Sequence, residues 1–106
     1  MGKSDGVYQG HFLFDPADPI YADHFPGNPV VPGSLIIHAF MSAVRSEFEG
    51  RGAWRVENFR FVHFISPGRY SFRVERQADG CFRCTLYTKG RKAMTGSLVP
   101  EPLNHS

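Results

Sequence analysis

The chain has 106 residues, of which 42% are hydrophobic, and its formal net charge is +2 at pH 7. That length suits one hydrophobic core and is too short for two, so we expect a single domain over residues 1–106, with an ordered core at about 7–99. The positive charge is weak and scattered, which argues against a nucleic-acid partner. No apolar run approaches the roughly 18 residues of a membrane span, so we expect a cytoplasmic protein with no membrane contact.

The first predicted element is a strand over residues 7–14, which is ended by two Asp-Pro pairs. A loop rich in proline and glycine follows and leads into an apolar run at Leu35. Proline locks the backbone and glycine reaches conformations that other residues avoid, so this loop is predicted to be rigid and irregular. His24 stands at its mouth, and a histidine titrates near neutral pH.

Residues 34–48 are predicted to form a helix that ends at the glycine-rich segment 49–52. Its apolar side chains point in nearly every direction, which is typical of a helix buried on most sides. Ser34 stands near the start, as a cap or a first-turn residue. One face breaks the apolar pattern with a line of polar side chains, at Ser34, His38, Ser42 and Arg45.

Four strands are predicted after the helix. The first covers residues 53–65, with a change of phase near Asn58 that indicates a bulge. Pro67-Gly68 turns the chain into a second strand at 69–75, where apolar and polar side chains alternate. Asp79-Gly80 predicts a two-residue hairpin into a third strand at 82–86, and Lys89-Gly90 predicts a turn into a fourth at 91–99. Together these elements make an α+β domain whose sheet must curl around the helix to cover it.

Cys81 and Cys84 form a C-x-x-C pattern, which can serve as a redox motif or as half of a zinc site. They fall at a predicted strand, where side chains three residues apart point to opposite faces, so the two sulfurs would not meet. We therefore expect structural or incidental cysteines, with neither a metal nor another cofactor.

The loop and the start of the helix resemble the active-site signature of the 3-hydroxyacyl-(acyl carrier protein) dehydratases. The match is specific through His24-Phe25-Pro26-Gly27, Pro29, Pro32-Gly33 and Leu35-Ile36-Ile37, and it continues more weakly through Phe59-Arg60-Phe61 and Pro67-Gly68. The resemblance covers roughly residues 14–99. It implies the hotdog fold, in which about five antiparallel strands wrap one long helix. It also implies a homodimer or higher oligomer with active sites between protomers.

The resemblance implies a lyase that removes water from 3-hydroxyacyl thioesters on acyl carrier protein or coenzyme A, in fatty-acid, related lipid or polyketide biosynthesis. Such a reaction needs a base for the C2 proton, a donor to the thioester oxygen and an acid for the leaving hydroxyl. His24 is the expected base, and the backbone N–H of Gly33 is the expected oxygen donor. His38 stands where the family has Glu or Asp, so it is either the acid partner or a core histidine.

The remaining expected substrate contacts come from the same segments. Ser34 and Ser42 continue the polar line of the helix. Ser42 either binds a water or the substrate hydroxyl, or is simply exposed at a small gap. Phe25 and Phe61 are expected to line an acyl tunnel, with Phe59 and Phe64 as further candidates; simple core packing is the alternative for all four. His63 is given no catalytic role. Basic side chains along the strands either form a solvated face or help to dock an acidic carrier protein, namely Arg69, Arg73, Arg76, Arg83, Arg91 and Lys92.

Two other functions remain open from the sequence. The histidine at position 38 is compatible with a non-catalytic module that binds acyl chains or a carrier protein on the same fold. A hotdog thioesterase is the third possibility, although the proline-glycine loop resembles the dehydratases much more closely.

Overall fold

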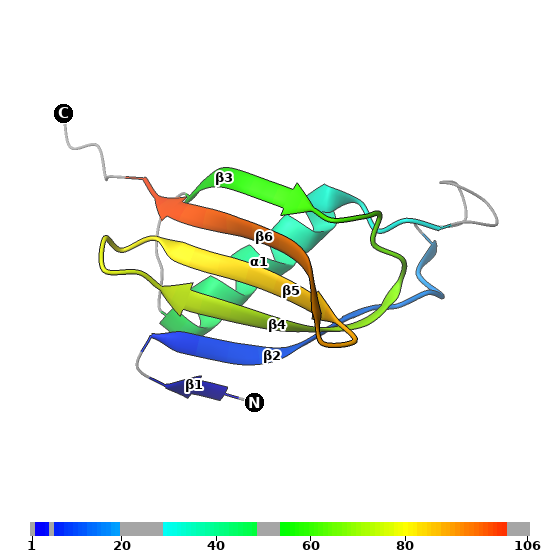
Figure 1. Cartoon of the computed structure of the whole chain (residues 1–106), viewed down its shortest axis with the longest axis horizontal. Helices are drawn as coiled ribbons and strands as arrows, with labels where there is room; N and C mark the ends of the chain where they lie inside the picture. The colour runs from blue at the N-terminus through cyan, green and yellow to red at the C-terminus, as the bar shows by residue number, and fades with distance from the viewer. Residues whose placement is uncertain (1, 5, 20–28, 49–53, 102–106) are drawn as a thin grey trace.

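The computed structural model describes residues 2–4, 6–19, 29–48 and 54–101 and shows one helix against one antiparallel sheet (Figure 1). Its elements are β1 (Gly2–Ser4), β2 (Val7–Phe14), α1 (Gly33–Phe48), β3 (Trp54–Phe61), β4 (Gly68–Arg76), β5 (Phe82–Thr88) and β6 (Arg91–Pro100). The strand order is β1-β2-β4-β5-β6-β3, and α1 crosses the sheet diagonally behind it in Figure 1. The predicted α+β architecture is confirmed, and β1 is an additional strand that the sequence did not predict.

The core fills the space between the sheet and α1. In β4 the predicted alternation is confirmed, because Tyr70, Phe72 and Val74 are buried and the residues between them are not. The ring of Phe72 stacks on that of Phe12 in β2, with centroids 4.0 Å apart. Phe12 in turn meets Phe40 of α1 edge to face at 5.0 Å, an arrangement that aromatic quadrupoles favour. Aromatic contacts therefore tie β2 and β4 to the helix.

α1 presents one stripe of side chains to the sheet. Ile36, Phe40, Val44 and Phe48 follow one another at four-residue spacing and are buried. This spacing places them on one side of an α-helix. The predicted polar line lies in solvent, since its four members are all exposed, namely Ser34, His38, Ser42 and Arg45.

The bulge predicted near Asn58 is confirmed. Glu57 pairs with Ser97 and Arg60 with Thr95, so β3 has one residue more than β6 between these two pairs. Asn58 takes a φ of 56°, in the left-handed region that asparagine tolerates better than most residues. The extra residue leaves Phe59 packed against the core, with its ring 6.4 Å from that of Phe40.

Replacing Gly96 with alanine is expected to destabilise the fold, because the ring of Phe59 occupies the space of a side chain there. A Cβ at position 96 would lie 2.4 Å from Cδ1 of Phe59, well inside contact distance. Overpacking of this kind costs about 1–3 kcal/mol, which urea denaturation measures as a fall in the free energy of unfolding. In a Phe59→Ala background the same Gly96→Ala change should cost much less, and an equal cost in both backgrounds would contradict the assigned clash.

The turn between β4 and β5 is one residue longer than predicted. The N–H of Gln77 donates to the carbonyl of Cys81 at 2.7 Å, and the N–H of Gly80 donates to the carbonyl of Gln77 at 3.0 Å. Three residues, 78–80, therefore form the loop, with Gly80 at a φ of 89°. The backbone N–H of Cys81 also donates to Oδ1 of Asp79 at 3.0 Å, which lowers the pKa of that carboxyl. This side-chain bond favours the longer loop over the predicted two-residue turn.

The two cysteines are free, and only Cys84 lies in β5; Cys81 precedes that strand, so the interpretation that placed both cysteines in one strand is wrong for Cys81. Cys84 is buried in the core, and burial raises the pKa of its thiol to about 12. Cys81 is only half-buried, at the end of the β4–β5 turn. The C-x-x-C pattern therefore forms no disulfide. Among the described residues no group of three or more His, Cys, Asp or Glu side chains is placed to hold a metal ion.

Candidate functional site

A largely apolar pocket of about 490 Å³ lies at the start of α1, and we call it the helix-start pocket. Two segments that are far apart in the sequence form it: the end of the proline-glycine loop, and the stretch between β3 and β4. Its lining residues are Val30, Val31, Pro32, Gly33, Phe61, His63, Phe64 and Ile65. The cavity is large enough for part of a small-molecule ligand, since ligand pockets span roughly 300–1,000 Å³.

Main-chain hydrogen bonds hold the two segments together. The N–H of Val31 donates to the carbonyl of Ile65 at 2.7 Å, and both side chains are buried. The N–H of Val62 donates to the carbonyl of Ala93 at 2.9 Å, so the stretch after β3 is also fixed to β6. The strand predicted over 53–65 therefore ends early, at Phe61, because the chain leaves the sheet to pair with the loop.

The first turn of α1 borders the pocket. The carbonyl of Pro32 accepts from the N–H groups of Leu35 and Ile36, at 3.0 and 3.3 Å, so the helix begins at Gly33. Ser34 is thus a first-turn residue and not the cap. The first N–H groups of a helix have no intrahelical acceptor and carry the positive end of the helix dipole. This end of the pocket is therefore suited to an oxygen atom that carries partial negative charge.

Gly33 allows an aromatic ring to lie against the helix start. A Cβ at position 33 would sit 3.4 Å from Cζ of Phe61, in van der Waals contact with the ring. The ring of Phe61 covers this backbone from the side, while 38% of the residue remains exposed. Gly33 and Phe61, both expected substrate contacts, are therefore neighbours in one pocket.

His63 also lines the helix-start pocket, although sequence reasoning gave it no catalytic role. Its Nδ1 lies 2.8 Å from the carbonyl oxygen of Phe64, which accepts a hydrogen bond from that nitrogen when it carries the proton. In the neutral ring this leaves Nε2 unprotonated and able to accept a hydrogen bond. In the sequence, the only indication that His63 belongs to the site is its alternation with Phe59 and Phe61. That alternation does not continue beyond the end of β3.

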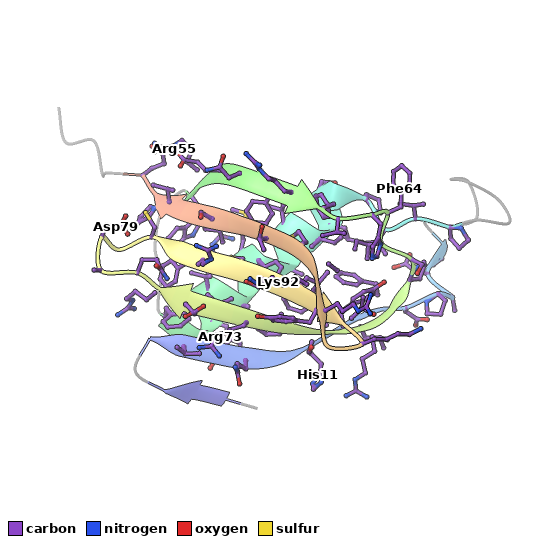
Figure 2. The ribbon with its side chains drawn as sticks, in the orientation of Figure 1. His11, Arg55, Phe64, Arg73, Asp79 and Lys92 are labelled. Atoms are coloured by element: carbon purple, nitrogen blue, oxygen red, sulfur yellow. The ribbon has the colours of Figure 1, made fainter. Side chains whose placement is uncertain are left out.

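The segment that follows β3 leaves large apolar side chains exposed beside the pocket. Phe64 is 84% exposed and Val62 is 71% exposed, which is unusual for side chains of this size. Figure 2 shows Phe64 at one end of the molecule, opposite Arg55 and Asp79. The two side chains thus form an uncovered apolar edge beside the pocket.

The other expected site residues do not line this pocket in the single chain. His38 and Ser42 lie on the exposed face of α1, together with Ser34. The structure brings Gly33 and Phe61 together and leaves the polar line of the helix apart from them. The predicted positions of His24 and Phe25 lie outside the described residues.

Comparison with known protein families finds a match to a family described as ApeI-like, ApeI dehydratase, over residues 2–97. Among curated proteins, the 3-hydroxyacyl-(acyl-carrier-protein) dehydratase FabZ of Caldicellulosiruptor saccharolyticus is 37% identical over 96 residues, covering 77% of this chain and 68% of that protein. The FabZ of Thermomicrobium roseum is 32% identical over 92 residues, covering 79% of this chain. The chain spans only 61% of the length of the Thermomicrobium protein.

Among solved structures, the dehydratase heterocomplex ApeI:P from Xenorhabdus doucetiae matches with a TM-score of 0.69 and 19% identity, covering 91% of this chain and 88% of that one. At this sequence identity the structural similarity is evidence for the fold alone, and it confirms the predicted hotdog architecture. Within the described residues, no helix has the length and apolar character to cross a membrane.

Proposed function

The chain belongs to the ApeI-like dehydratase family, and from that membership we propose that it removes water from 3-hydroxyacyl thioesters carried on acyl carrier protein or coenzyme A. The observation that carries the proposal is the helix-start pocket, where an apolar cavity meets the N–H groups of the first turn of α1. An acyl chain suits the apolar wall, and the thioester oxygen suits the helix start. Cytoplasmic fatty-acid, lipid or polyketide biosynthesis is the expected setting.

In the proposed reaction His24 takes the proton from C2 of the substrate. The electron pair moves toward C1, and the thioester oxygen becomes negative and accepts a hydrogen bond from the N–H of Gly33. The hydroxyl then leaves C3 as water after it receives a proton from His38, and a double bond forms between C2 and C3. His24 and Gly33 take these roles from the dehydratase signature, because they match its motif positions.

The proposal gives the acid role to His38 through a second copy of the chain. The dehydratase signature implies that this helix position faces the partner's His24 across a dimer interface. His38 is exposed on α1 and does not line the pocket of its own chain, which supports that arrangement. Of two imidazoles in one site, a neutral one can take a proton and a protonated one can give it. Such a pair contains one base and one acid, which is what dehydration needs.

Three features of the single chain support a homodimer. β3 is at the edge of the described sheet, where its outer hydrogen-bonding groups are open to another strand. Val62 and Phe64 leave apolar surface uncovered beside the pocket. On α1, Ile37 is only half-buried, lies outside the core cluster and adjoins the polar line.

We expect sedimentation at micromolar concentration to give twice the chain mass of 11.9 kDa. Ile37→Lys should shift the protein toward monomer, because it places a charge on the helix face assigned to the partner. Ser46→Lys, at an exposed position near the end of α1, is the matched control and should remain dimeric. A monomeric parent would remove the composite-site model.

The activity itself is tested with purified protein and 3-hydroxyacyl or 2-enoyl thioesters of several chain lengths. The enoyl thioester absorbs in the ultraviolet, so hydration and dehydration are both followed directly. We expect turnover in both directions and an equilibrium mixture from either side. Release of free thiol in place of enoyl product would identify a thioesterase.

The second candidate function is an acyl-binding module without catalysis, and the histidine at position 38 favours it. A histidine there does not hold a water as a carboxylate does, so the fold would bind the thioester and leave it unchanged. Saturable binding of an acyl thioester with no change in its absorbance over hours would support this candidate.

A further inference from the structure

A second cavity, of about 420 Å³, adjoins the helix-start pocket on the side of the β5–β6 turn. We call it the cationic groove, and its lining residues are Val62, His63, Thr88, Lys89, Arg91 and Lys92. His63 lines both cavities, so the groove opens directly beside the helix-start pocket. Nothing in the proposed dehydration step uses these cations.

The groove is positively charged, and within the part of the chain that the structure describes its cations form no ion pair. Lys89, Arg91 and Lys92 are all exposed, and its lining contains no carboxylate. The ion pairs that the described residues make with one another are centred on Arg55 and Arg73, far along the strands from this turn. Three uncompensated cations around one hollow attract an anion and strengthen its hydrogen bonds.

A tight backbone turn sets the positions of the residues that carry these cations. Lys89 and Gly90 have φ angles of 51° and 76°, so they form the tight two-residue turn that the sequence predicted. Thr88 pairs with Arg91 across that turn. On the opposite wall, the hydrogen bond from Val62 to Ala93 fixes the groove to β6. The main chain of the groove therefore needs no rearrangement when a ligand binds.

We propose that the cationic groove binds the phosphate of the pantetheine arm, which links the acyl chain to acyl carrier protein or coenzyme A. The inference rests on the proposed function, because it takes the ligand to be such a thioester. The phosphate accepts hydrogen bonds from Lys89, Arg91 and Lys92. The arm carries two methyl groups beside this phosphate, and Val62 offers apolar surface in the same groove.

This placement also gives the arm a direction. With its phosphate at the β5–β6 turn, the arm passes His63 and delivers the thioester toward Gly33 in the helix-start pocket. Carrier protein and coenzyme A share the phosphate and the pantetheine, so the groove would serve both kinds of substrate. His63 thereby acts as a positioning residue between the two cavities.

The test compares two substrates with the same 3-hydroxyacyl chain, one on 4′-phosphopantetheine and one on pantetheine without the phosphate. For the parent protein we expect kcat/KM to favour the phosphorylated substrate about tenfold or more, the effect of one or two charge-assisted hydrogen bonds. In a Lys89→Gln, Arg91→Gln, Lys92→Gln triple variant the ratio should fall toward one. Lys92→Gln alone should lower the ratio to a value between that of the parent and one. This single variant provides the test if the triple variant does not fold.

Arg83→Gln is the matched control, because Arg83 is an exposed arginine of β5 that does not line the groove. It should keep the parent preference for the phosphorylated substrate. A parent ratio near one, or an unchanged ratio in the triple variant, would overturn the groove assignment while leaving the dehydratase proposal in place.

A binding measurement separates the two proposals when turnover is absent. Calorimetry with 4′-phosphopantetheine and with pantetheine needs no catalysis, and the parent should bind the phosphorylated compound more tightly. The preference should shrink as salt rises, because the cations are exposed. If the protein shows no turnover but a clear preference for the phosphorylated compound, dehydration is contradicted and the groove assignment is supported. Equal affinity for both compounds would reject the groove assignment.

Discussion

Replacing His24 with alanine is expected to lower kcat/KM for a 3-hydroxyacyl thioester by at least about a hundredfold, because it would remove the proposed base for the C2 proton. The loss should appear in kcat, since the alanine variant keeps the pocket and the helix start that we propose as the acyl-binding site. Steady-state kinetics with the phosphopantetheine thioester measure both parameters. The hydration direction should fall by the same factor, because the two directions share one transition state.

His11→Ala is the matched control for this variant. His11 is an exposed histidine on β2 that does not line the helix-start pocket, and Figure 2 shows it well away from Phe64. Its replacement should leave kcat unchanged within the error of the assay. Urea midpoints of both variants should match the parent. A fully active His24→Ala protein would exclude the base role and with it the proposed order of proton transfers.

The second large effect concerns His38. His38→Ala should lower kcat by at least about a hundredfold if the imidazole protonates the leaving hydroxyl. His38→Glu restores the residue type of the dehydratase signature and should keep or raise activity. In an apolar cleft between protomers, desolvation raises the pKa of a glutamate and suits it to donate a proton. Ser46→Ala, at another exposed position of α1, is the control and should be silent.

The pH profiles of these variants separate the roles further. The parent should show a bell-shaped dependence of kcat, because one imidazole must be neutral while the other is protonated. The pH profile of His38→Glu should keep the limb that depends on His24 and replace the limb that depends on residue 38. An inactive parent whose His38→Glu variant gains dehydration would support the binding module as the natural function. Inactivity of both proteins toward every chain length would reject the lyase proposal.

Much of the fold was predictable because the side chains alternate as the strands require. Tyr70, Phe72 and Val74 repeat every second residue, and the break in phase near Asn58 marked the bulge. β1 was not predictable, since Gly2–Ser4 has no apolar alternation and depends on pairing with β2. The predicted β4–β5 turn is one residue too short, because the hydrogen bond from the N–H of Cys81 to the Asp79 side chain favours the longer loop.

The candidate site was predictable only where a motif stood in the sequence. Gly33 belonged to the proline-glycine motif, and Phe61 to the weaker patch after it. Phe64 was only one of four candidates for an acyl tunnel, and His63 was given no catalytic role, because their positions follow from where β3 ends. That end is set by the bond between Val31 and Ile65, which joins residues more than thirty positions apart. Periodicity within one segment carries no information about such a contact.

The bond between Val31 and Ile65 joins main-chain atoms, so the frame of the helix-start pocket does not depend on which side chains line it. Val30, Phe61 and Phe64 can be exchanged for larger or smaller residues while the two backbone segments stay joined. The size of ligand that the cavity admits is therefore separable from the folding of the chain. Selection, natural or in the laboratory, can resize the cavity one side chain at a time without rebuilding its walls.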